Sequence, residues 1–248
     1  MAEERTPPPR PQPPVKEPGL ISFLVWHLPW KLLGLFFFSL FLSIVLEFVG
    51  ITFFWSDAGW HHSQEVLLTE LAWFRDDFRQ GLSVVSGMSP GGLTSSVIGT
   101  LHEWLMVKSG FEAWVDAGAG ESAGLMNRAG SSLSRLLQDY ILAAIHVTLV
   151  CVLRVLVLLY TLPFFFLVML AGATEGWMMR ELRRFGAAYE SSFIYHHARR
   201  MIKPLFLLPW LVYLNIPVAV WPPVILLPSG LLLASAVMAT VATFKKYL

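Results

Sequence analysis

Long apolar runs with very few charges constrain this chain more than any other feature. One run covers 32–55, a second covers 140–173, and a third covers 205–244. About 18 or more consecutive apolar residues are enough to cross the hydrocarbon core of a bilayer as a helix. Only 14% of the residues are charged, whereas an ordinary soluble domain carries about 25%. The sequence therefore excludes a soluble domain and predicts an all-α, polytopic membrane protein.

The three runs divide into about four predicted transmembrane helices. Trp221-Pro222-Pro223 interrupts the last run, and a proline pair ends one helix and can start the next. The predicted spans are therefore 32–55, 140–173, 205–221 and 223–244.

The segments between the spans predict the orientation. Residues 56–139 contain five Lys/Arg and ten Asp/Glu, whereas residues 174–204 contain six Lys/Arg and three Asp/Glu. The positive-inside rule then places 174–204 in the cytoplasm as a basic amphipathic helical loop and 56–139 outside. Four spans put both termini in the cytoplasm, including the Pro-rich residues 1–20, which are predicted to form a disordered tail.

The external segment is predicted to be a small helical layer on the membrane surface. In HSQEVLLTELAWFRDDFRQGL the apolar residues recur at a helical period. His61, His62 and Glu65 invite a metal reading, but adjacent histidines point about 100° apart on a helix and no further ligand motif accompanies them. Solvated interface histidines are the favoured reading, and the sequence predicts no metal and no cofactor.

Two ionisable residues lie inside the predicted spans. A charge in hydrocarbon is costly and usually faces protein or water. Counted from the cytoplasmic edge at 1.5 Å per residue, Glu47 and Arg154 fall at similar depths, roughly 24 to 27 Å. The sequence predicts an ion pair between them, and the competing reading is that each extends separately to the headgroups.

The stretch RELRRFGAAYESSFIYHHARR brings arginines and aromatic residues together in the cytoplasmic loop. Such a segment is typical of an interfacial helix pair on anionic lipids, and a docking surface for a partner protein is a further reading. Direct contact with DNA is disfavoured, because three acidic residues dilute the six basic ones. The candidate docking residues are Arg180, Arg183, Arg184, Phe185, Tyr195, His196, Arg199 and Arg200.

The same stretch resembles a known family. Arg183-Arg184-Phe185-Gly186, followed by Glu190-Ser191-Ser192-Phe193 and Tyr195-His196, is similar to inner-membrane proteins encoded by integrating conjugative elements. The resemblance covers most of the architecture, although Ala187-Ala188-Tyr189 stands where the family usually has a Gly-rich, basic junction. It implies a bacterial inner-membrane protein that works near the coupling ATPase and the type IV secretion channel.

The resulting expectation is a non-enzymatic scaffold or accessory protein of conjugative DNA transfer. Its expected partners are the coupling ATPase or secretion subunits, together with anionic lipids, and the sequence leaves oligomer formation open. A small transporter or export factor is the alternative, but it requires more polar groups at mid-membrane. A membrane enzyme requires a clustered nucleophile or metal set, which the motifs do not supply.

Overall fold

A computed structural model describes residues 28–81, 90–110, 125–185 and 192–244. The predicted tail at 1–20 and part of the basic stretch, residues 186–191, lie outside them. The chain divides into two units, residues 1–38 and 39–248. In the first unit the described residues are the opening turns of a helix, and the contacts described below all lie in the second.

The predicted all-α fold is confirmed for the described residues, which contain helices and no strand. Six of the described helices are α-helices, and η2 is a short π-helical stretch that continues α4. The elements are α2 (Leu28–Phe53), α3 (His61–Gly81), α4 (Pro90–His102), η2 (Glu103–Lys108), α6 (Leu125–Phe185), α7 (Ser192–Asn215) and α8 (Pro222–Ala242).

Three of these helices are long and apolar enough to cross a membrane. The candidate segments are Trp30–Phe53 in α2, Leu137–Leu182 in α6 and Pro222–Ala242 in α8. The predicted fourth span at 205–221 is not confirmed, because α7 ends at Asn215. The apolar part of α7, from Leu205, is therefore roughly 16 Å long, about half of a hydrocarbon core.

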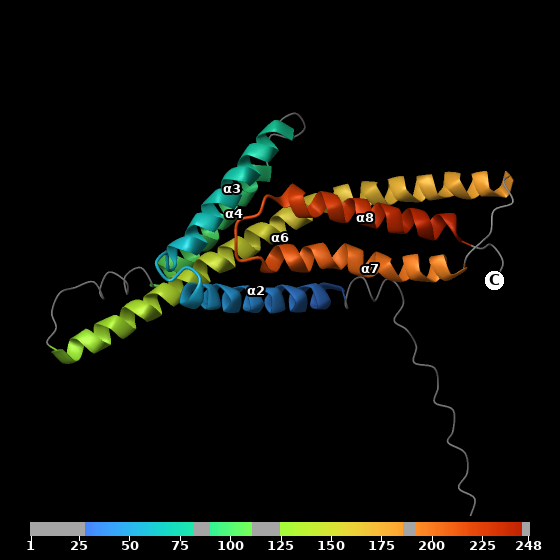
Figure 1. Cartoon of the computed structure of the whole chain (residues 1–248). Helices are drawn as coiled ribbons and strands as arrows, with labels where there is room; N and C mark the ends of the chain where they lie inside the picture. The colour runs from blue at the N-terminus through green and yellow to red at the C-terminus, as the bar shows by residue number, and fades with distance from the viewer. Residues whose placement is uncertain (1–27, 82–89, 111–124, 186–191, 245–248) are drawn as a thin grey trace, which may run out of the picture. The chain divides into compact units, whose positions relative to one another are not determined.

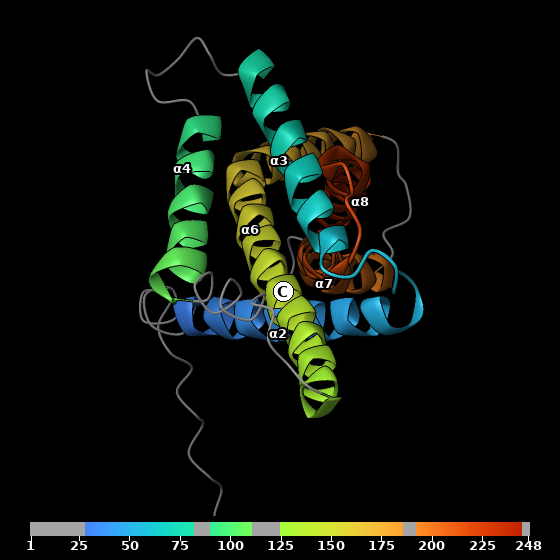
Figure 2. The ribbon, with the colours of Figure 1, turned by 90° about the vertical axis from the view of Figure 1, so that its left-hand side faces the viewer.

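The long helix α6 organises the rest of the second unit. Its C-terminal half packs against α8, which also packs along α7, so the three helices lie side by side (Figure 1). Figure 2 shows α3 and α4 beside α6, and both contact it. The segment predicted to be an external layer therefore includes a helix, α3, that packs directly on a candidate span.

The sequence of α3 explains this contact. Val66, Leu67 and Phe74 follow the predicted apolar stripe, and all three are buried. Arg75 and Asp76 lie off the stripe and are exposed. The helix is amphipathic, with one side covered by the protein and the other polar.

Glycines bring α6 and α8 into close contact. Gly172 and Gly176 are spaced four residues apart, the pattern that lets two membrane helices approach closely. A Cβ atom at Gly172 would lie 2.5 Å from the carbonyl oxygen of Ala234, and one at Gly176 would lie 2.6 Å from that of Met238. Because the obstructing atoms are backbone, a side chain at either position would push the helices apart.

Replacing Gly172 with alanine is therefore expected to lower the stability by about 1–3 kcal/mol, the usual cost of overpacking. Gly99→Ala in α4 is the matched control, since no atom lies within 4 Å of the added Cβ and alanine favours a helix by up to about 1 kcal/mol over glycine. Thermal unfolding in nanodiscs would give the melting temperatures of both variants. Equal melting temperatures for Gly172→Ala and the unchanged protein would contradict the close packing.

Candidate functional site

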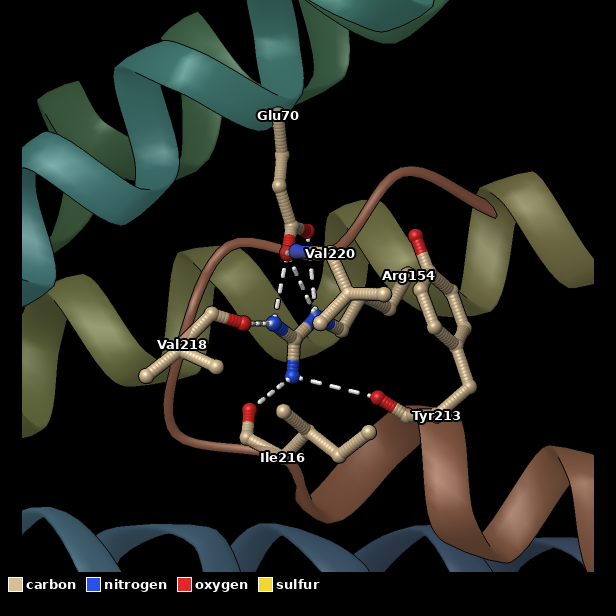
Figure 3. A network of polar contacts seen from close by, with 6 residues as sticks. All are labelled: Glu70, Arg154, Tyr213, Ile216, Val218 and Val220. Atoms are coloured by element: carbon tan, nitrogen blue, oxygen red, sulfur yellow. Dashed lines mark hydrogen bonds and ion pairs between the residues drawn. The ribbon is translucent and has the colours of Figure 1, made fainter. Parts of the chain in front are cut away.

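A buried ion pair joins α3 to the middle of α6. The side chain of Arg154 in α6 is 1% exposed, and Glu70 in α3 is also buried. The guanidinium Nε donates to both carboxylate oxygens of Glu70, at 3.1 and 3.0 Å, and Nη2 donates to Oε1 at 2.5 Å (Figure 3). In this fork geometry both oxygens of the Glu70 carboxylate accept charge-assisted hydrogen bonds from one side chain.

The remaining donors of Arg154 hold the chain between α7 and α8. Nη1 donates to the carbonyl oxygens of Tyr213 and Ile216 at 3.1 and 2.5 Å. Nη2 also donates to the carbonyl oxygen of Val218 at 2.9 Å (Figure 3). The last carbonyl groups of a helix have no partner within it, so the arginine supplies donors where α7 stops.

The carboxylate contributes to the same turn. Oε1 of Glu70 accepts a hydrogen bond from the backbone nitrogen of Val220 at 3.4 Å. Residues 213–220 therefore receive contacts from both members of the pair. We call Arg154, Glu70 and residues 213–220 the arginine clamp.

The predicted ion pair between Glu47 and Arg154 is wrong, because each residue pairs with a side chain from α3. Oε1 of Glu47 lies 3.1 Å from Nδ1 of His62, and Arg154 pairs with Glu70. Glu47 and Arg154 nevertheless line the same cavity, of about 10 Å³, together with Ser43 and Ser63. Glu47 and Arg154 are thus close to each other, as their similar depths predict, but His62 and Glu70 of α3 are their ion-pair partners.

The histidines of α3 contact aromatic rings. His62 stacks on Trp55 with ring centroids 4.1 Å apart, and His61 lies against Trp60 at 3.9 Å. Among the described residues, no three His, Cys, Asp or Glu side chains are grouped as a metal site requires. His61 and His62 thus belong to a layer of aromatic contacts at the start of α3.

A second cluster forms where α6 ends, α7 begins and α8 ends. Arg180 lies over the ring of Phe244 at 5.8 Å, and Tyr195 contacts the same ring at 5.9 Å. Arg199 donates from Nη1 to the hydroxyl of Tyr195 at 3.2 Å. The structure thus brings together three predicted docking residues, Arg180, Tyr195 and Arg199, around Phe244. Sequence reasoning missed Phe244 because it is the last apolar residue of the predicted span 223–244 and carries no sign of a different role.

The other described docking residues lie exposed around this cluster. Phe185 is 89% exposed, and His196 and Arg200 are exposed as well. Leu182 on the last turns of α6 is also exposed. Arg183 and Arg184 belong to α6, and their side chains lie outside the described part of the structure. We call Arg180, Phe185, Tyr195, His196, Arg199, Arg200 and Phe244 the basic aromatic end.

Replacing Arg154 with methionine is expected to destabilise the fold by about 3–5 kcal/mol, because Glu70 becomes an unpaired buried charge. The double variant Arg154→Met/Glu70→Leu should regain part of this loss, but not all, because the carbonyl groups of Ile216 and Val218 still lack their donor. Arg75→Met, at an exposed position of α3, is the control and should change stability by less than about 0.5 kcal/mol.

The single cysteine of the chain provides the readout. Cys151 is 1% exposed and lies one helical turn before Arg154. Its rate of maleimide labelling in membranes should rise in Arg154→Met, rise less in the double variant and stay low in Arg75→Met. Labelling of Cys151 that is equally slow in the three variants and in the unchanged protein would show that the arginine clamp does not stabilise the fold.

The sequence itself connects this architecture to known proteins. Residues 54–245 match the family described as IncC plasmid conjugative DNA transfer protein DtrJ-like. No curated protein and no solved structure matches the chain. The match begins immediately after α2 and includes both the arginine clamp and the basic aromatic end. The predicted place in conjugative transfer is confirmed at the level of this family, and the chain belongs to the DtrJ-like family of conjugative DNA transfer proteins.

Proposed function

We propose that this protein is a non-enzymatic membrane scaffold of conjugative DNA transfer, on a plasmid or an integrating conjugative element, and that it holds a protein partner at its basic aromatic end. The observation that carries the proposal is the convergence of α6, α7 and α8 at Phe244, with Arg180 and Tyr195 in contact with its ring. Three helices joined at one end make a fixed platform for the exposed residues around them. The family match supports a role in DNA transfer.

The proposed location is the bacterial inner membrane, with the basic aromatic end in the cytoplasm. The end of α8 contacts the start of α7, so the two helices form a hairpin that returns the chain to the side on which α6 ends. Phe244, just after α8, then lies with the arginines, and arginines favour the cytoplasmic side. The hairpin therefore supports a cytoplasmic location for the end of α8, although the apolar part of α7 is too short to be a full span.

The proposed partner is the coupling ATPase or a subunit of the secretion channel. Arginine and aromatic side chains are enriched among the residues that dominate protein interfaces. Phe185 is almost fully exposed beside the cluster, and an exposed aromatic ring among cations suits an acidic surface with an apolar pocket. The same residues also suit anionic headgroups, so lipid is the competing occupant.

The double variant Arg199→Gln/Arg200→Gln is expected to reduce the frequency of DNA transfer by about tenfold or more, because each lost charge-assisted hydrogen bond to a partner is worth about 1.5–3 kcal/mol. Arg75→Gln/Lys108→Gln removes the same charge from exposed positions elsewhere and should transfer normally. Mating assays at matched protein levels, with Cys151 protected from maleimide in each variant, would measure the effect. Normal transfer by Arg199→Gln/Arg200→Gln would reject the basic aromatic end as a docking site.

A photoreactive amino acid at Phe185 would identify the occupant directly in donor cells. We expect an adduct with the coupling ATPase or a secretion subunit that disappears in Arg199→Gln/Arg200→Gln. An adduct with lipid alone would make this end a membrane anchor and overturn the proposed docking.

A further inference from the structure

An apolar groove lies where α3, α6 and the start of α8 meet. It has a volume of about 230 Å³. Phe74 contributes from α3, and Figure 1 shows α3 crossing α6 close to the beginning of α8. The other lining residues are Val157, Thr161 and Phe164 of α6 and Pro222, Pro223, Leu226 and Leu227 of α8.

The chemistry of the lining selects an alkyl chain. Thr161 is the single residue of the lining with a polar side chain, and its hydroxyl already donates to the carbonyl oxygen of Leu158 at 2.9 Å. Water in a protein cavity needs two to four polar partners, and the side chains of this lining offer only the acceptor side of that one hydroxyl. Empty apolar space loses dispersion contacts, so a hydrocarbon ligand would stabilise the groove.

The surroundings of the groove indicate where the hydrocarbon comes from. Its two main walls belong to α6 and α8, which are both candidate membrane spans. Leu227 on the lining and Val224 beside it are more than half exposed, at 51% and 59%, so the groove opens on the surface that these spans would present to lipid.

The polar side of α3 gives this region an amphiphilic profile. Phe74 lies in the groove, whereas the next two residues, Arg75 and Asp76, are exposed and charged. A charged helix face cannot lie in hydrocarbon without a large cost. The groove therefore runs between an interfacial helix and two apolar spans, which matches a molecule with a polar head and an alkyl tail.

We propose that this groove binds one acyl chain of a membrane phospholipid. The inference rests on the membrane location given under the proposed function, and it adds a lipid site between α3, α6 and α8 that is separate from the basic aromatic end. A bound chain would fill the space between α3 and α8 and so support the packing beside the arginine clamp, since Val157 lies one turn beyond Arg154 on α6.

The test uses the full chain in liposomes that contain a phospholipid with a diazirine on its acyl chain. After illumination, we expect lipid adducts to concentrate in the peptides that carry 157–164 and 222–227. In Thr161→Trp the indole ring would occupy the space of the acyl chain. We expect the lipid affinity of the groove, and with it the yield of these adducts, to fall by about tenfold. Leu170→Trp is the matched control on α6, because Leu170 is 51% exposed and does not line the groove.

Two results would overturn the lipid site. Adducts that are spread evenly over the exposed faces and are unchanged in Thr161→Trp would show ordinary lipid contact. Failure of the protein to float with liposomes after alkaline extraction would overturn both this inference and the proposed location. Thr161→Phe serves as the smaller replacement if maleimide labelling of Cys151 shows that Thr161→Trp is misfolded.

Discussion

The guanidinium of Arg154 joins three parts of the chain that are far apart in sequence. It pairs with Glu70 of α3 and donates to carbonyl groups of residues 213–218, where α7 gives way to an extended segment. Non-helical backbone in an apolar setting requires partners for its polar groups, and here one buried cation supplies them. The pair costs desolvation, and its carbonyl contacts explain why a charge at this position is compatible with the fold.

The clamp and the glycine contacts fix opposite ends of the same hairpin. The clamp holds the turn between α7 and α8, whereas Gly172 and Gly176 bring the later part of α8 against α6. With both contacts in place, Phe244 after α8 meets Arg180 of α6 and Tyr195 of α7. The geometry of the basic aromatic end is therefore a consequence of packing along the whole length of the hairpin.

Sequence patterns predicted the helices better than they predicted their partners. Apolar runs and a helical stripe identified α2, α8 and the buried side of α3, because burial leaves a periodic pattern of side chains. Glu70 was missed because it lies in a polar helix, where a carboxylate carries no sign that it is buried. The early end of α7 was missed because residues 205–221 are apolar throughout apart from Asn215, and hydropathy does not reveal that the backbone at 216–221 is held by an arginine from another helix.

The predicted ion pair between Glu47 and Arg154 failed for a similar reason. Glu47 and Arg154 were expected to meet because one dimension, depth along the helices, was all that their positions in the sequence could supply. The structure keeps that depth, since both line one small cavity, but α3 adds His62 and Glu70 as nearer partners. Both Glu47 and Arg154 are thereby paired with side chains of α3, so this amphipathic helix is an integral part of the packing around the candidate spans. Movement of α3 would leave Glu47 and Arg154 without their side-chain partners and would remove the contact between Glu70 and Val220. The hydrogen bonds from Arg154 to Ile216 and Val218 come from α6 and would still hold the turn between α7 and α8.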